Sequence, residues 1–256
     1  MMEGAAKGIG YLAGHWPPDP AKSTIIFIHG AGGSGLFWRA QVEGLAARAN
    51  TIALDLPGHG RSGGEGCDHI EDYARSVIDF IKAVDVSKPV LCGISMGGAV
   101  VQQLLLDYPD LLKAGILLNT GAKLKVAPVI FDMLEKDYNG YLSTIGKLVA
   151  CKTTQPEQLK QFQEETARCK PEVTRKDFRA CNRFDVMQRV GSITLPVLVV
   201  SAEDDQLTPP KYGEFLKNNI PNASRILIAE AGHILPAEKP EEFNGAIINF
   251  LDDSNP

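Results

Sequence analysis

Short, continuous apolar runs alternate with amphipathic stretches in the first half of the chain. Residues 23–28, 51–54, 90–93 and 114–119 predict strands, because each run is apolar throughout instead of alternating with polar residues. Residues 38–47, 68–83 and 96–107 have apolar positions at helical spacing. Asp68, with Glu71 three positions later, predicts a capped helix start. This order predicts an α/β fold with a mostly parallel central sheet and helices on both faces.

The alternation stops after residue 119 and resumes near residue 195. Between them the chain is polar and helix-prone, with helical patterns over 126–149, 156–169 and 174–190. Strands at 195–200 and 225–228 and helices at 210–218 and 240–251 then follow. We predict a core of residues 1–122 and 193–256 and a helical cap, or lid, of residues 123–192. The cap should cover the carboxyl edge of the sheet, where such folds bind ligands.

Composition narrows the choice of partners and compartment. The 256 residues are 44% hydrophobic and 22% charged, with a net charge of −5. The sequence has no stripe of Lys or Arg residues, so we expect the protein to bind neither nucleic acid nor an anionic membrane. No signal-peptide pattern and no apolar run of membrane-spanning length is present. The five cysteines are an odd number without a Cys-x-x-Cys pair, which argues against disulfides and a zinc site and predicts a cytoplasmic protein.

The segment Gly93-Ile94-Ser95-Met96-Gly97 carries the strongest chemical signal. This Gly-x-Ser-x-Gly pattern lies between a predicted strand and a predicted helix. A sharp turn at that junction strains the serine backbone and exposes its hydroxyl above the sheet. Side chains at Gly93 and Gly97 would collide where strand and helix pass closely. Ser95 is therefore the candidate nucleophile.

A serine nucleophile needs a base and a group that orients the base. Of the histidines at 15, 29, 59, 69 and 233, only His233 lies in a short loop between the last predicted strand and helix. The acid should follow a strand at the same edge. Position 119, after one candidate strand, is an asparagine, whereas Glu203, Asp204 and Asp205 follow the strand at 195–200. Position alone leaves these three carboxylates open.

Together these segments resemble the α/β-hydrolase superfamily over nearly the whole chain. The matching segments are residues 29–33, 55–62, 93–98, 203–209 and 232–233, and the order Ser, Asp, His is that of the superfamily. The resemblance selects Asp205 as the acid, although Ala202 stands where the family usually has glycine, and Asp204 stays the alternative. It also implies oxyanion donors at the backbone N–H groups of Ala31 and Met96, with Gly32 as the alternative to Ala31. His29 and His59 are expected to be structural.

The run Met96-Gly97-Gly98 resembles the elbow of small bacterial carboxylesterases. The resemblance implies hydrolysis of small to medium acyl esters through an acyl-enzyme, by a monomer or homodimer, without cofactor or metal. Carbon–carbon hydrolysis or enol-lactone hydrolysis on the same residues is the alternative, and a non-catalytic binding protein is a further one. Candidates for the substrate pocket are Gly30, Gly32, Trp38, Tyr138 and Leu142. Trp38 could instead pack in the core, and the apolar cap positions do not separate pocket from core.

Overall fold

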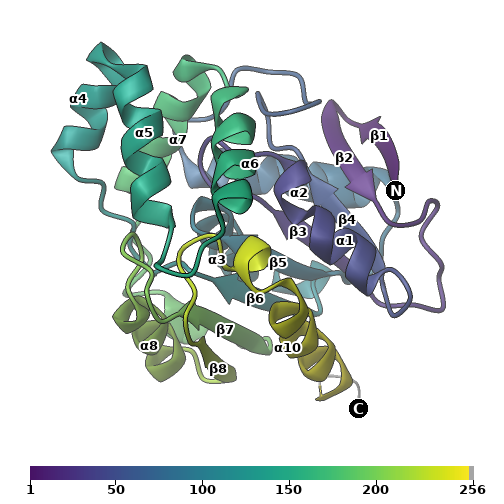
Figure 1. The fold of residues 1–256 in the computed structure, drawn as a ribbon. Coiled ribbons are helices and arrows are strands. Elements are labelled where there is room, and N and C mark those ends of the chain that lie inside the picture. The colour runs from purple at the N-terminus through teal and green to yellow at the C-terminus, as the bar shows by residue number, and fades with distance from the viewer. Residues whose placement is uncertain (254–256) are drawn as a thin grey trace.

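The central feature of the computed structural model, which describes residues 1–253, is one eight-stranded sheet (Figure 1). The strand order is β1-β2-β4-β3-β5-β6-β7-β8. Strands β3 to β8 run parallel, whereas β1 and β2 are antiparallel to their neighbours. The strands are β1 (Met2–Ala6), β2 (Ile9–Ala13), β3 (Thr24–Ile28), β4 (Asn50–Leu54), β5 (Val90–Ile94), β6 (Ala114–Leu118), β7 (Val197–Ala202) and β8 (Ala223–Ile228). The predicted mostly parallel sheet is confirmed.

Helices cover both faces of this sheet. Strand β3 shows why its sequence is apolar throughout: Ile26 and Ile28 pack in the core cluster on one face, and Ile25 and Phe27 in the cluster on the other. The first face is covered by α2 (Ile70–Ala83), α3 (Met96–Asp107) and α8 (Pro210–Asn219), and the second by α1 (Arg39–Leu45) and α10 (Pro240–Asp253). Short helical turns η1 (Gly35–Trp38), η2 (Pro109–Leu111) and α9 (Leu235–Glu238) complete the core.

The N-terminal hairpin β1–β2 was not predicted. Strand β1 is largely exposed and Gly-containing, so it lacks the apolar run that marks the other strands. Its turn is formed by Lys7 and Gly8, both at positive φ (52° and 78°), as two-residue hairpin turns require. The hairpin lies at the edge of the sheet opposite β8 (Figure 1).

The predicted cap of Asp68 on helix α2 is wrong. The helix begins at Ile70 after His69, and no side chain caps it. Asp68 instead accepts a hydrogen bond from Arg179 at 2.5 Å. A charged partner on another helix has replaced the local capping interaction.

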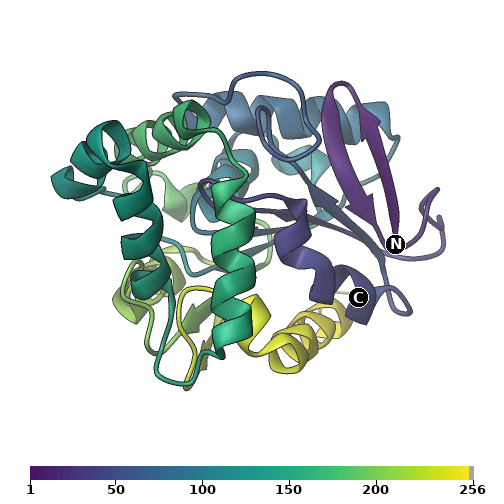
Figure 2. The same cartoon turned by 45° about the horizontal axis from the view of Figure 1, so that its top comes forward.

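Between β6 and β7 the chain forms four helices, which lie together on one side of the sheet (Figures 1 and 2). They are α4 (Pro128–Lys136), α5 (Tyr138–Val149), α6 (Pro156–Ala167) and α7 (Pro171–Arg183), followed by the turn η3 (Val190–Ser192). Ile130, Leu134, Tyr141, Ile145 and Val149 form a small apolar cluster among them with Ile234 of the core. We call residues 123–192 the cap.

Candidate active site

Ser95 sits at the junction of β5 and α3 with a backbone that only an enforced turn tolerates. Its φ is 54° and its ψ is −117°, outside the regions that residues with a Cβ normally adopt. The turn is tight: a Cβ on Gly93 would overlap the Gly97 carbonyl, and a Cβ on Gly97 would overlap the Ile28 carbonyl. The predicted close passage of strand and helix is confirmed. Ser95 is partly exposed and lines a cavity.

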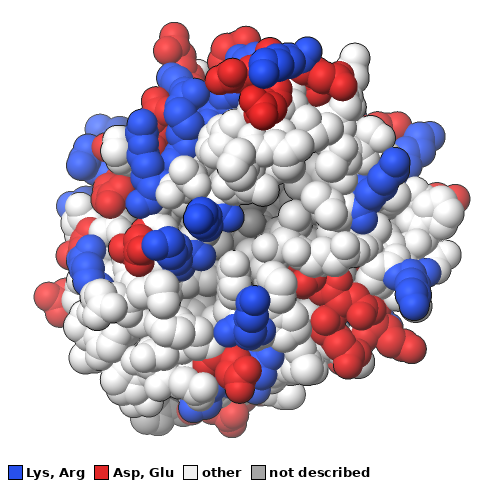
Figure 3. All heavy atoms as spheres, turned by 90° about the vertical axis from the view of Figure 1, so that its left-hand side faces the viewer, with Lys and Arg blue, Asp and Glu red and all other residues white. Residues whose placement is uncertain are grey.

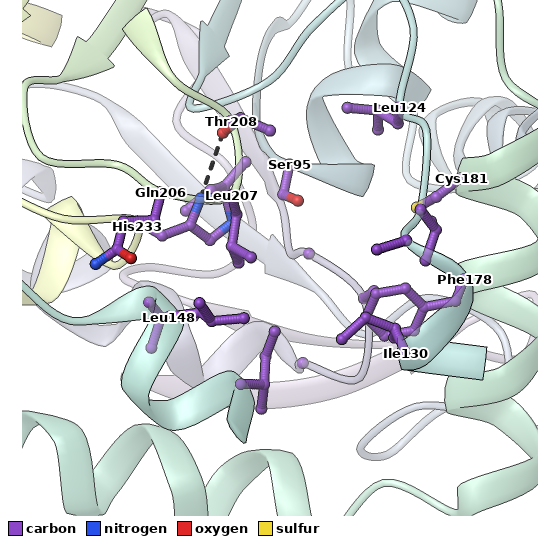
Figure 4. A pocket seen from close by; sticks show the side chains of 18 of the residues that line it. Ser95, Leu124, Ile130, Leu148, Phe178, Cys181, Gln206, Leu207, Thr208 and His233 are labelled. Carbon is purple, nitrogen blue, oxygen red and sulfur yellow. Dashed lines mark hydrogen bonds between the residues drawn. The ribbon is translucent and has the colours of Figure 1, made fainter. Parts of the chain in front are cut away.

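His233 lines the same cavity and is paired with Asp205. The ring nitrogen Nδ1 lies 2.8 Å from Asp205 Oδ2, and both side chains are buried. Thr208 Oγ1 donates to the same carboxylate oxygen at 2.7 Å and lies 3.4 Å from His233 Nδ1. Figure 4 shows Ser95 with His233 and Thr208 to one side of it and Cys181 and Phe178 across the cavity.

Asp205 is the carboxylate that the fold brings to His233. Its Oδ1 accepts the backbone N–H groups of Leu207 and Thr208 at 2.9 and 3.0 Å. Burial alone raises the pKa of Asp205, but the adjacent His233 and the bonds from Thr208 outweigh it and hold the pKa below its ordinary value. Glu203 and Asp204 are exposed. Asp205 is therefore an ionised group suited to orient an imidazole.

Asn119 braces the His233 loop, a role that the sequence did not reveal. Its Nδ2 donates to the carbonyls of Gly232 and His233 at 3.2 and 3.0 Å, and its Oδ1 accepts the Ala202 N–H at 2.9 Å. Asn119 follows β6 with φ 42°, a conformation that asparagine tolerates better than most residues. The signal for this role in the sequence was the asparagine at position 119, at the end of a strand where a carboxylate was sought. Asn119 thereby ties the His233 loop to the end of β7, where Asp205 follows.

The loop after β3 runs along the cavity and presents candidate oxyanion donors. Gly30 and Ala31 line the cavity. Ala31 N–H and Met96 N–H donate to no protein group among residues 1–253; Ala31 lines the cavity, whereas Met96 is buried and is not among the lining residues. Gly32, the alternative donor, gives its N–H to Asp177 Oδ2 at 2.8 Å. Gly32 also does not line the cavity.

His29 anchors this loop as a neutral imidazole. Its Nδ1 faces the Gly30 carbonyl at 2.8 Å, and its Nε2 accepts the Leu56 N–H at 3.0 Å. One nitrogen must therefore carry a proton and the other must not. Complete burial, together with the neighbouring His59, lowers the pKa of His29 to about 4. The expected structural role fits this arrangement.

The cavity has a volume of about 410 Å³ and lies between the sheet edge and the cap. Tyr141 and Ile145 of α5, Phe162 of α6 and Phe178 of α7 form much of its apolar wall. Among the described residues that line the cavity, Lys125 alone carries a permanent charge, and its side chain is exposed. Figure 3 shows the face on this side of the molecule, with a largely uncharged middle and basic side chains beside the hollow.

Besides Gly32, three more residues predicted for the pocket lie elsewhere. Trp38 is completely buried in the core, between Phe27, Phe37 and Phe243, and its neighbour Phe37 lines the cavity instead. Tyr138 donates to the Cys169 carbonyl at 3.3 Å, and Leu142 packs on the apolar cluster of the cap. The cap helices bury one face against each other and another against the cavity, and Tyr141, three residues after Tyr138, lines the cavity.

No group of three or more His, Cys, Asp or Glu side chains could hold a metal ion within residues 1–253. No helix in that range is long and apolar enough to cross a membrane.

Comparisons with known proteins agree with this architecture. The chain is 26% identical to a putative carbamate hydrolase RutD of Caulobacter sp. (strain K31), over 98% of each chain. It is 26% identical to 3-oxoadipate enol-lactonase 2 of Acinetobacter baylyi, over 88% of this chain and 87% of that one. A solved thermophilic esterase is 30% identical with a TM-score of 0.85, over 99% and 98% of the two chains. Residues 25–246 match the model of the alpha/beta hydrolase family. The chain therefore belongs to the alpha/beta hydrolase family.

Proposed function

We propose that this protein is a serine hydrolase that cleaves carboxylic esters through an acyl-enzyme intermediate. The observation that carries the proposal is the meeting of two features in one cavity. Ser95 stands there on a strained turn, and His233 stands there hydrogen-bonded to the buried Asp205. A nucleophile, a base and a group that orients the base are the parts that acyl transfer requires.

In the proposed reaction, His233 Nε2 takes the Ser95 proton as Oγ attacks the ester carbonyl carbon. The carbonyl π bond breaks and its oxygen becomes the oxyanion, held by the Ala31 and Met96 N–H groups. Collapse breaks the bond to the alcohol, which leaves with the proton from His233. Water, deprotonated by His233, attacks the acyl-enzyme in the same way and releases the acid and free Ser95. Asp205 stabilises the imidazolium in both halves.

The cavity supports an acyl group that is apolar and uncharged. A volume of about 410 Å³ walled by aromatic and aliphatic side chains exceeds what carbamate would fill, so the activity named for the RutD relatives is disfavoured here. Each methylene buried there contributes about 0.8 kcal/mol. Small to medium acyl chains should therefore gain up to about fourfold in kcat/KM per added methylene until the cavity is filled.

Enol-lactone hydrolysis is the second candidate, and Lys125 is the observation that favours it. The enol-lactone of an oxoadipate keeps one carboxylate, and Lys125 puts a single exposed cation at the cavity. Replacing Lys125 by Gln should raise the KM for an anionic lactone and leave neutral esters unaffected. If anionic lactones are turned over faster than all neutral esters, and Lys125→Gln abolishes that preference, lactonase is the better assignment.

A panel of p-nitrophenyl esters of rising acyl length tests the proposal on wild type and Ser95→Ala. We expect wild type to hydrolyse short and medium chains and Ser95→Ala to lose at least about 10³-fold in kcat. A fluorophosphonate should label wild type at Ser95, which a non-catalytic binding protein would not do. Turnover that survives in Ser95→Ala would refute the mechanism.

The preceding residue, Asp204, provides a matched control for the role of Asp205. Asp205→Asn should lower kcat by about 10² to 10⁴-fold, since the amide cannot stabilise the imidazolium. Asp204→Asn changes an exposed side chain next to it and should keep wild-type activity. Similar losses in the two variants would contradict the assigned roles.

A further inference from the structure

A buried carboxylate on the cap takes no part in the proposed chemistry. Asp177 of α7 is completely buried and accepts hydrogen bonds on both oxygens. Oδ2 accepts the Gly32 N–H and His59 Nε2, each at 2.8 Å, and Oδ1 accepts the Tyr73 hydroxyl at 2.5 Å. The cap, the β3 loop and helix α2 thus meet at one side chain.

His59 is a cation in this cluster, as its two neighbours require. Its Nε2 faces the Asp177 carboxylate at 2.8 Å and its Nδ1 faces the Pro57 carbonyl at 3.1 Å. Both partners are acceptors, so both nitrogens carry protons. Burial alone lowers the pKa of His59, but the charge and hydrogen bond of Asp177 outweigh it and raise the pKa well above its ordinary value. The pair is a buried ion pair, which holds its geometry firmly because either partner alone is costly.

The Asp177 bond fixes the direction of the candidate oxyanion loop. Gly33 N–H closes a turn on the Gly30 carbonyl at 3.1 Å, and Gly32 has φ +67°. With the Gly32 N–H turned toward the cap, the preceding amide of Ala31 stays unpaired beside the cavity. Gly32 also lies against Thr174 of α7, next along the helix face from Asp177.

We propose that Asp177 is a positioning residue that holds the Ala31 amide toward the cavity by accepting the Gly32 amide, so that the cap sets the oxyanion loop. The inference rests on the proposed ester hydrolysis. It differs from simple anchoring of the cap, because the cap has another link to the core that does not touch this loop. Arg179, also on α7, donates to Asp68 at 2.5 Å.

Asp177→Asn and Asp68→Asn form the matched pair for the test. In Asp177→Asn the amide offers one acceptor and one donor group, so Gly32, His59 and Tyr73 cannot all keep their bonds. We expect kcat for a p-nitrophenyl ester to fall about 10 to 100-fold, less than the 10² to 10³ for a lost oxyanion donor. KM should stay within about twofold, since ground-state contacts in the cavity are unchanged. Asp68→Asn should keep wild-type kcat.

A second measurement separates positioning from general damage to the fold. An aliphatic trifluoromethyl ketone forms a tetrahedral adduct with a serine nucleophile, whereas an alcohol of equal length only fills the cavity. Asp177→Asn should weaken the ketone in parallel with kcat and leave alcohol inhibition unchanged. If Asp177→Asn does not fold, Asp177→Glu keeps the charge beside His59, displaces the oxygens from Gly32 and should give the same pattern.

Two outcomes overturn the inference. One is an unchanged kcat in a folded Asp177 variant. The other is a parallel loss of kcat, ketone affinity and alcohol affinity, with the same loss in Asp68→Asn, which would make the cluster an anchor alone. Failure of the proposed function is distinguishable, because wild type would then lack Ser95-dependent turnover altogether.

Discussion

His29 makes the stability of this protein depend on pH in a predictable direction. Its neutral form satisfies both of its neighbours, whereas a proton on Nε2 would point at the Leu56 N–H, a second donor. The pKa of His29 falls from 6.5 to about 4 in the fold, for which burial is the largest cause. A histidine with a lowered pKa contributes stability above its unfolded pKa, and that contribution is lost as the pH falls toward the folded value.

The magnitude follows from the two pKa values. At pH 7.5 His29 is neutral in both states, so its full contribution to stability is present. At pH 5.0 the unfolded chain binds a proton that the folded chain does not, which costs about 2 kcal/mol, and the loss approaches about 3 kcal/mol below pH 4. His59 acts in the opposite direction. Its raised pKa gives stability that is fully present below its unfolded pKa and is lost as the pH rises through the folded value.

Guanidinium unfolding at pH 7.5 and 5.0, followed by tryptophan fluorescence, measures this pH-dependent loss of stability. His29→Gln should be less stable at pH 7.5 by about 1 to 3 kcal/mol, because the flexible amide does not keep the fixed geometry in which the two ring nitrogens bond Gly30 and Leu56. Between pH 7.5 and 5.0, however, it should lose about 2 kcal/mol less than wild type. His15→Gln alters an exposed side chain and should keep the wild-type pH dependence.

Equal losses in wild type and His29→Gln between the two pH values would refute the reasoning. His29 would then not be held neutral in the folded state. A reduced loss in His15→Gln would show that the pH-dependent loss of stability comes from histidines in general and not from this buried one.

Three further outcomes are expected. Asn119→Ala should cost about 1 to 3 kcal/mol in urea unfolding, because it leaves the buried Ala202 N–H unpaired, and should lower kcat as the His233 loop loosens; full activity would contradict this. Gly97→Ala should lower the free energy of unfolding in urea by about 3 kcal/mol, since its Cβ would overlap a carbonyl. Gly245→Ala, with open space in helix α10, should raise it by about 0.5 kcal/mol; equal effects of the two substitutions would contradict this. Phe178→Ala enlarges the cavity and should move the preferred p-nitrophenyl ester to a longer acyl chain, an unchanged optimum being the contrary result.

The core strands could be predicted because burial on both faces leaves a clear pattern. Strand β3 is apolar at every position after Thr24, since alternate side chains enter the two clusters. The strand-to-helix turn at Ser95 has a comparably strong local cause, because two close backbone approaches admit glycine alone. The β1–β2 hairpin has neither signal, since its outer strand is mostly exposed.

The pocket could not be predicted from the sequence, since apolar residues of the cap serve two purposes. Tyr138 and Tyr141 are one helical turn apart on α5, yet only Tyr141 reaches the cavity. Trp38 and Phe37 show the same ambiguity on η1, where a rotation of one residue exchanges core for pocket. Which face meets the cavity depends on how the helices dock, and that is a tertiary property.

Under the proposed mechanism, the cap affects the rate as well as the choice of substrate, because the same helices do both. On α7, Phe178 lines the cavity while the adjacent Asp177 accepts the Gly32 amide at 2.8 Å. On α5, Tyr141 lines the cavity while the Val149 carbonyl accepts the His233 N–H at 2.8 Å. Under the proposed mechanism, both the oxyanion loop and the base are held from the cap. Substitutions that shift α5 or α7 to admit a new acyl group should therefore change kcat together with specificity.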